Sequence, residues 1–503
     1  MRASTLVRLA VSGTRTDSVR LLLTAFGSAL ATLGWLCAAT VAALGFAGSD
    51  LGSAADDNRY TSALLREPGL RPGVVTAFVL LTIPVLAFVG QCARLGAPAR
   101  DRRIAAMRLA GATPRQAVAV GAGESGASAL LGSALGVASY FVLRRVLDNV
   151  NAHGQRTLPT DVLPSLWVIV VVAVALPVVV ALGSAWLLRA VTTSPLGVVR
   201  RGPRRRPPRV WPGILILIGL LTFAGFAPLV RFLSHHRIAI PASLTLTIFY
   251  VGVLMTVLGV VVGAGWIAYA TGCVLRRASR RAAGQLAAAR LIADPWQGSR
   301  AFGVLMVAAV FGGGTAVIYQ HFVSMAATTE AQNRLVATLM HQPYEASPPD
   351  SFYTNATLLV AIAVLLAAVI GALGQLVAIS EAIVSRRRAY AGLVAAGVPR
   401  SVLARAQLWQ SLAVAVPALT LATTAGLLIG RFVTGTSVHA GAGSIQTGDG
   451  PVIKIPDVVG AVPVPWANLG LVVGVSVGAV ALTVAIGLLF LKASTSVDEL
   501  RTA

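Results

Sequence analysis

Long apolar runs separated by short charged or proline-rich breaks dominate the chain. A bilayer core about 30 Å thick needs roughly 20 mainly apolar residues per helix. We therefore predict an all-α polytopic membrane protein with about ten transmembrane helices. Their ranges are 21–47, 72–93, 118–143, 164–189, 210–231, 243–274, 301–321, 355–380, 405–431 and 466–491.

Two segments between these runs have patterns of their own. Residues 286–295 alternate apolar positions with Arg290, which predicts an amphipathic helix lying on the inner membrane surface. The glycine-rich segment 432–465 predicts a flexible outer loop, although the alternation over 452–455 leaves a hairpin open. The other outer loops are predicted at 48–71, 144–163, 232–242 and 322–354, and all are too short for a folded domain of usual size.

Composition and charge fix the class and the orientation. Hydrophobic residues make up 56% of the chain and charged residues 12%, against about 25% charged residues in soluble domains. The chain has 41 Lys and Arg against 18 Asp and Glu, for a net charge of +23. Most basic residues fall in inner segments if the N-terminus is inside, as the positive-inside rule requires. We expect a multi-pass protein of a bacterial plasma membrane with both termini cytoplasmic.

The basic balance does not indicate a nucleic-acid partner. The arginines cluster close to helix ends, as in the loop at 200–209. Such clusters set topology and meet anionic lipid headgroups, at about 1 kcal/mol per residue near the surface. Membrane lipids are therefore the expected partners of this charge.

One short basic pattern occurs twice, each time between two long apolar runs. Residues 102–112 read RRIAAMRLAGA, and nearly three hundred residues later 388–398 read RAYAGLVAAGV. Each predicts a short cytoplasmic helix that ends at a left-handed glycine. We interpret the pair as docking helices for a cytosolic partner, and the alternative is an amphipathic helix resting on lipid. The candidate docking residues are Arg102, Ile104, Met107, Arg108, Gly111, Arg388, Tyr390, Leu393 and Gly397.

The duplication divides the chain into two halves of the same plan. The first half covers 1–190, a linker with two helices covers 191–285, and the second half covers 286–503. An even number of helices separates equivalent positions, so the halves are predicted to be parallel repeats.

The first copy and its continuation carry a family likeness. The run RLAGATPRQ at 108–116, followed by Glu124 in a small-residue-rich helix, resembles the FtsX-like permease domain. Ten helices with two such units are similar to bacitracin-type peptide resistance permeases, without their large extracellular domain. The resemblance implies the membrane subunit of a mechanotransmission-type ABC transporter, with a possible role in antibiotic resistance. It also implies two copies of a separate ATPase that carries ATP and Mg, and action on a lipophilic compound or peptide at the outer leaflet.

The sequence lacks the residues that catalysis on this chain would require. Its lysines are Lys454 and Lys492, and neither follows a glycine, so there is no phosphate-binding loop. His235 and His236 have no matching metal ligands nearby in the sequence, so we expect no metal site. The chain is therefore predicted to be a non-catalytic permease.

Glu124 is an ionisable residue inside a predicted membrane helix, which makes it a candidate functional residue. We expect it to pair with Arg115 or another inner arginine, and a role in coupling or in proton relay stays open. Its counterpart in the second half is Gln410. Two alternative functions also stay open: an ATPase-partnered regulator that signals, and a gradient-driven transporter using Glu124 and Gln375.

Overall fold

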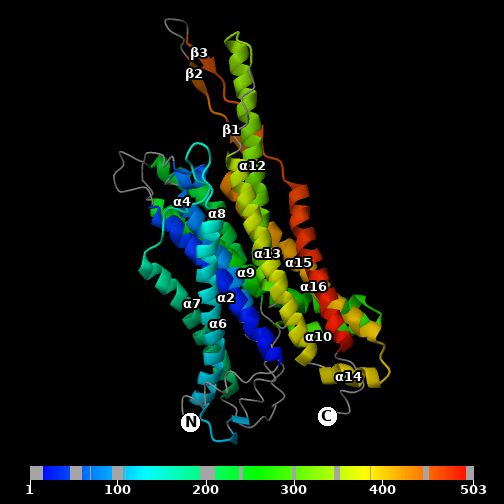
Figure 1. Ribbon diagram of the computed structural model, residues 1–503. Helices are drawn as coiled ribbons and strands as arrows, with labels where there is room; N and C mark the ends of the chain where they lie inside the picture. The colour runs from blue at the N-terminus through cyan, green and yellow to red at the C-terminus, as the bar shows by residue number, and fades with distance from the viewer. Residues whose placement is uncertain are drawn as a thin grey trace. The chain divides into compact units, whose positions relative to one another are not determined.

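A computed structural model describes residues 15–45, 59–67, 70–92, 106–107, 109–192, 210–236, 242–296, 302–344, 352–385, 387–445 and 452–493. Within these ranges, nine helices are long and apolar enough to cross a membrane. The fifth predicted segment forms α8 (Pro212–His235), whose apolar stretch Pro212–Phe226 is shorter than in the other nine. The prediction of an all-α polytopic membrane protein is confirmed (Figure 1).

The chain packs as two compact units, which are described separately. Unit 1 contains Met1–Arg205, Val369–Ala404 and Thr483–Ala503, and unit 2 contains Arg206–Ala368 and Arg405–Leu482. Three of the helices of the second half, α13 (Phe352–Ser385), α15 (Arg400–Thr434) and α16 (Trp466–Ala493), contribute to both units.

Unit 1 is built around α2 (Arg15–Ala43), α4 (Arg71–Cys92), α6 (Pro114–Val146) and α7 (Leu166–Thr192). Helices α2 and α6 approach closely because α6 has glycines at the contact, and a Cβ on Gly136 would lie 2.6 Å from the Ala29 carbonyl oxygen. Hydroxyls add interhelical hydrogen bonds, with 3.1 Å between Thr32 and Ser133. Small residues and hydroxyl bonds are the usual means of holding helices together in lipid.

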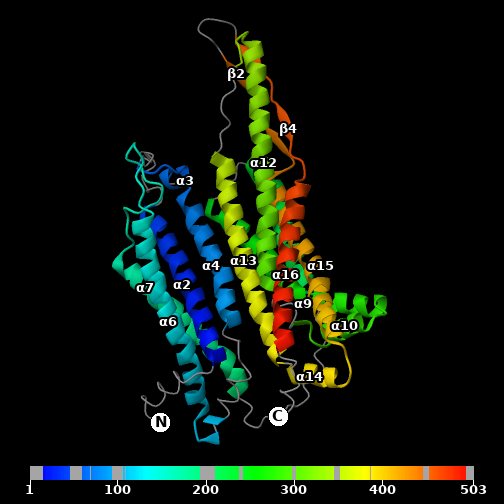
Figure 2. The ribbon, with the colours of Figure 1, turned by 45° about the vertical axis from the view of Figure 1, so that its right-hand side comes forward.

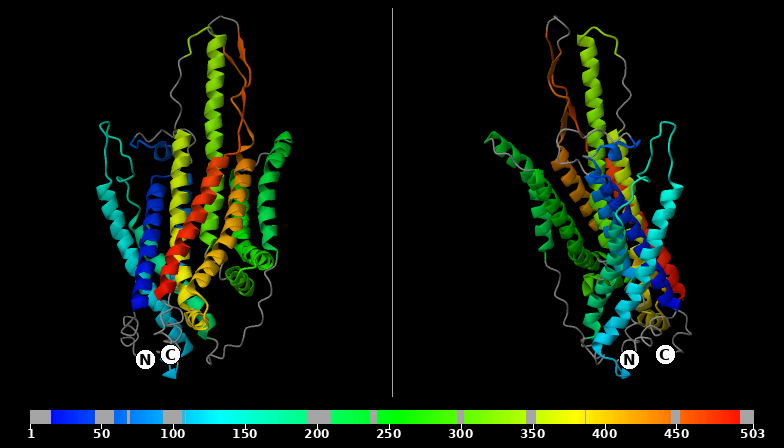
Figure 3. Two further views of the ribbon diagram at one scale, coloured as in Figure 1. Left: turned by 90° about the vertical axis from the view of Figure 1, so that its right-hand side faces the viewer. Right: turned by 60° about the vertical axis from the view of Figure 1, so that its left-hand side comes forward.

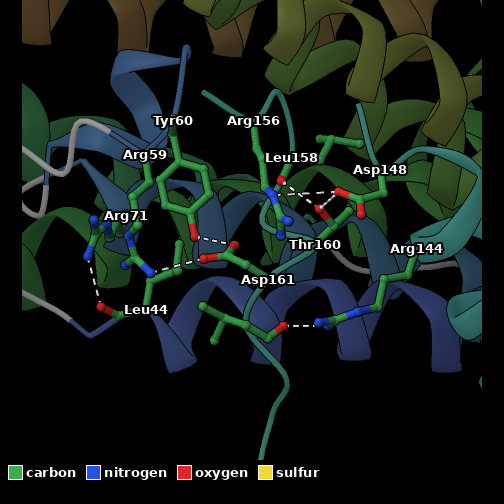
Figure 4. Close-up of polar contacts among 11 residues, drawn as sticks. Leu44, Arg59, Tyr60, Arg71, Arg144, Asp148, Arg156, Leu158, Thr160 and Asp161 are labelled. Carbon is green, nitrogen blue, oxygen red and sulfur yellow. Dashed lines mark hydrogen bonds and ion pairs between the residues drawn. The ribbon is translucent and has the colours of Figure 1, made fainter. Parts of the chain in front are cut away.

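Two loops and a short helix, α3 (Ala63–Arg66), close one end of unit 1 (Figure 4). Tyr60 is fully buried and donates to Asp161 at 2.6 Å, and Arg59 forms an ion pair with the same carboxylate at 3.0 Å. The buried Arg71 guanidinium donates to the Leu44 carbonyl at 2.9 Å. The two predicted outer loops of the first half are thus tied to each other and to the helices.

Unit 2 contains α8, α9 (Ala242–Ala278), α10 (Ala282–Ala293), α12 (Gly303–Leu339), and parts of α13, α15 and α16. Helix α10 is the predicted amphipathic helix, and its buried face packs on α9, where Gly272 leaves room for Leu291. Helices α12 and α15 approach as closely as α2 and α6 do, because Gly426 contacts the Val310 backbone directly.

A further contact occurs in both halves, between the third helix and the loop that leads to the fourth helix. Arg144, near the end of α6, donates to the Val162 carbonyl just before α7. Arg431, near the end of α15, donates to the Val462 carbonyl just before α16, at 2.7 Å. The third and fourth helices of each half are therefore joined by the same arginine-to-carbonyl bond.

The predicted outer loops of the second half prove to be more ordered than expected. Helix 301–321 was predicted to end before a loop, but α12 continues to Leu339. The prediction of a flexible loop at 432–465 is also wrong over its described part, where strands form a two-stranded ribbon. Strand β1 (Ser437–His439) pairs with β4 (Val459–Ala461), and β2 (Gly443–Ile445) pairs with β3 (Ile453–Ile455).

The ribbon is ordered because it packs on the extension of α12 (Figures 2 and 3). Gly460 lies directly against Thr328, so no larger side chain would fit there. Gln332 donates to the Gly441 carbonyl at 2.6 Å. Asp457 adds a bond across the ribbon, accepting from His439 at 2.8 Å.

Candidate functional site

The first short helix lies between α4 and α6, and its last turn has a defined termination. The Ala110 amide donates to the Ala106 carbonyl and the Ala112 amide to the Met107 carbonyl, both at 3.0 Å. Gly111 between them has φ +92°. A bond that reaches back five residues across a left-handed glycine is the Schellman termination of a helix.

The second short helix, α14 (Arg387–Ala395), ends in the same way. The Ala396 amide donates to the Gly392 carbonyl and the Val398 amide to the Leu393 carbonyl, both at 3.0 Å, and Gly397 has φ +87°. The predicted left-handed glycines are therefore confirmed at both positions. The two segments share their backbone geometry as well as their sequence pattern.

Each short helix leads directly into a long helix. Thr113 caps α6 through a reciprocal pair of bonds: its hydroxyl accepts from the Gln116 amide at 3.3 Å, and the Gln116 side chain accepts from the Thr113 amide at 3.0 Å. Pro114 occupies the first turn of α6, where a missing N–H costs nothing. In the second half, Pro399 precedes Arg400, the first residue of α15. The connection between short helix and long helix is therefore tight in both halves.

The candidate docking side chains of the short helices are less exposed than the neighbouring Leu109. Met107 is partly buried and packs against Ala117 in the first turn of α6, and Tyr390 is only 3% exposed. Leu393 is intermediate in exposure, whereas Leu109 is 91% exposed. Periodicity identifies an apolar face without showing which neighbour covers it, and the docking role of Tyr390 stays a prediction.

Four of the predicted docking positions cannot be assigned a side-chain environment. Arg102, Ile104 and Arg108 lie outside the described residues, and of Arg388 only the backbone, within α14, is described. Their role in docking stays a prediction.

Glu124 pairs with an arginine of the first membrane helix. Arg20 of α2 lies 3.0 Å from the Glu124 carboxylate of α6, and the two side chains are 3% and 5% exposed. The expected pairing with an inner arginine is confirmed, and the partner is Arg20 rather than Arg115. Breaking such a buried pair by removing one charge costs about 3–5 kcal/mol, because the other charge stays buried.

The second half has no equivalent of this ion pair in its described part. Gln410 lies at the corresponding place in α15 and is intermediate in exposure. The N-terminal half of α12 carries no charged residue that would match Arg20. The two halves therefore share their backbone plan and differ in their intramembrane charge.

Two residues that the structure identifies as site candidates were not selected from the sequence. Leu109 was part of the repeated pattern but was not chosen, although it lies only two residues before the helix-ending Gly111. Arg20 was not singled out as a partner of Glu124. Its position at the start of an apolar run, on the predicted inner side like Glu124, was the available signal.

The comparison with known families agrees with this arrangement. The FtsX-like permease C-terminal family model matches residues 73–195, which include most of α4, the first short helix, and all of α6 and α7. This part of the chain is therefore similar to the FtsX-like permease domain. FtsX-like permeases are membrane subunits of ABC transporters and generally act with an ABC ATPase. No curated protein matches the chain.

Proposed function

We propose that this chain is the membrane subunit of an ABC transporter in a bacterial plasma membrane. Its two short helices dock two copies of a separate cytosolic ATPase, which binds ATP and Mg. ATP binding and hydrolysis on that partner move the helices and act on a lipophilic compound or peptide at the outer leaflet. The permease itself supplies no catalytic group.

The repeated Schellman termination is the observation that carries this proposal. Two helices with the same closing bonds, each joined tightly to a long helix, offer two equivalent surfaces to a partner that occurs in two copies. The exposed Leu109 is an apolar side chain available to such a partner.

Unit 1 also offers a path for the motion. A force on the first short helix acts on α6 through the Met107–Ala117 contact and the Thr113 cap. Helix α6 is joined to α2 by the Arg20–Glu124 pair and by the close backbone contact at Gly136. Helices α2 and α6 would then move as one body.

The pairing of Glu124 also bears on the gradient-driven alternative. A proton relay needs a carboxyl group that gains and loses its proton, whereas Glu124 is held against a buried guanidinium at 3.0 Å. This favours a positioning role for Glu124. An ATPase-partnered regulator that signals would use the same docking helices. It would differ from a transporter in moving no compound.

Two exposed positions on the short helices provide the test. Leu109→Asp and Ala395→Asp place a charge at the surface of the first helix and of α14 without disturbing a buried contact. The matched control is Ala289→Asp, an exposed alanine in the last part of α10, the third short helix predicted on the inner surface. The tagged chain is purified from its native membranes in mild detergent, and the accompanying proteins are identified by mass spectrometry.

We expect an ABC ATPase with the wild type and the Ala289→Asp control, and its loss in the Leu109→Asp/Ala395→Asp double variant. A double variant that retains the ATPase at the control level would overturn the docking assignment. A wild-type chain that purifies without an ATPase would overturn the proposed function.

A further inference from the structure

A cavity of about 300 Å³ lies within unit 2 and is lined by residues of α12, α13 and α16. This is at the lower end of the volumes that ligand pockets have. It extends along α12 from Ala308 to Tyr319, which is about 16 Å at 1.5 Å per residue. Its shape is therefore that of a narrow groove parallel to the helices.

The floor of the groove is buried and its rim is exposed. Ala308, Gly312 and Ala316 recur on one face of α12 and leave space where larger side chains would fill it. The rim leucines Leu358 and Leu471 are more than half exposed. Because all three helices are membrane-spanning candidates, the groove opens sideways into the predicted hydrocarbon layer.

The groove has a polar end and an apolar end. Tyr319, Thr357 and Asn468 line it where α13 and α16 begin, on the side from which α12 continues to the ribbon. Towards the opposite end, where Ala308 and Ala368 are the last lining residues of α12 and α13, the lining is alanine, leucine and valine apart from the buried Ser476 of α16. By the predicted topology, the polar end lies in the outer leaflet and the apolar end points towards the bilayer centre.

We propose that this groove binds one acyl chain of an outer-leaflet lipid amphiphile. The chain lies along Gly312 with its end near Ala308 and Ala368. The polar group at the head of the chain meets the Tyr319 hydroxyl and the Asn468 amide. The polarity of the groove matches such a molecule in both order and direction, whereas a peptide would leave its backbone groups without partners along the apolar lining. This inference rests on the proposed function and specifies the class of compound on which the transporter acts.

The test uses two lysophospholipid probes in nanodiscs, one with a diazirine at the end of the acyl chain and one with a diazirine at the headgroup. After photolysis, cross-linked residues are identified by mass spectrometry. We expect the chain-end probe to label the neighbourhood of Ala308 and Ala368, and the headgroup probe to label that of Tyr319 and Asn468. Labelling of the rim leucines alone, with no difference between the probes, would indicate annular lipid only and overturn the proposal.

Three variants make the test specific. Gly312→Leu fills the groove, since a Cβ there already lies 3.0 Å from Val472, and Ala361→Leu narrows it from the exposed rim without changing a buried contact. The matched control is Gly474→Leu, because a Cβ at this exposed position on α16 meets nothing within 4 Å. We expect both groove variants to lose most of the chain-end labelling and the control to keep it. Equal labelling in all three would contradict the proposal.

The outcome is separable from that of the docking test. Probe labelling needs no ATPase, and the groove variants leave the short helices unchanged. If the wild type retains the ATPase but shows no position-specific labelling, only the groove proposal is overturned. If the ATPase is lost but the position-specific labelling is retained, only the docking proposal is overturned.

Discussion

At the scale of single residues, the Arg20–Glu124 pair is the most consequential feature of unit 1. Two charges of opposite sign lie 3.0 Å apart, almost fully buried, between the first and third membrane helices. The sequence predicted that Glu124 would need a cationic partner, because an unpaired charge in a membrane helix is costly. It did not identify Arg20, since the rotation of α2 about its axis depends on the close packing at Gly136.

Removing one charge of this pair is expected to destabilise the protein strongly. Glu124→Gln removes the carboxylate that lies 3.0 Å from the buried Arg20 guanidinium, and the loss of one charge of a buried pair costs about 3–5 kcal/mol. The double variant Arg20→Met/Glu124→Gln removes both charges and should recover most of that loss. Thermal unfolding of the purified protein in detergent measures the difference. A Glu124→Gln protein as stable as the wild type would show that the pair does not hold α2 to α6.

At the scale of secondary structure, the sequence predicted most helices, missed the extension of α12 and left the hairpin open as an alternative to a flexible loop. Apolar runs are visible in composition, whereas residues 322–339 of α12 are polar enough to be assigned to a loop. The signal for a helix was their high content of helix-forming residues without glycine or proline. The ribbon was less predictable, because its order depends on contacts such as Gly460 with Thr328, far apart in the sequence.

The ribbon is expected to loosen at acidic pH. The hydrogen bond from His439, with a further bond from the Gly441 amide, lowers the pKa of Asp457 below its ordinary value. A carboxylate with a depressed pKa stabilises the folded ribbon above its unfolded-state pKa, and this contribution is lost as the pH falls through the depressed value. Asp457→Asn should imitate the acidic state at neutral pH.

Hydrogen exchange of the Gly441 amide, corrected for the intrinsic pH dependence, measures this effect. We expect protection at neutral pH in the wild type, and lower protection in acid and in Asp457→Asn. Protection that is the same in the variant would mean that packing on α12 alone orders the ribbon.

At the scale of the whole molecule, the duplicated basic pattern was the most informative part of the sequence. It predicted two halves with equivalent short helices, and the structure gives both the same terminating bonds. The bonds from Arg144 and Arg431 to the carbonyls before the next helix extend the repeat to the other end of each half. The difference between the halves at Glu124 and Gln410 was also visible in the sequence. The exposed side of each short helix was not visible, because it depends on which long helix covers it.

The predicted orientation can be tested by cysteine labelling of intact cells. In a background without Cys37, Cys92 and Cys273, Val150→Cys should react with a membrane-impermeant thiol reagent and Leu109→Cys should not. Both positions are exposed, so the difference reports the side of the membrane. The reverse labelling pattern would invert the topology and place the short helices outside.

The most direct test of the proposed function is the number of ATPase copies bound to one permease chain. Native mass spectrometry of the purified complex gives this number. The repeated helix termination predicts two copies for the wild type and one copy when either Leu109→Asp or Ala395→Asp is introduced alone. A wild-type complex with a single ATPase, or none, would contradict the claim that the two short helices are equivalent docking sites.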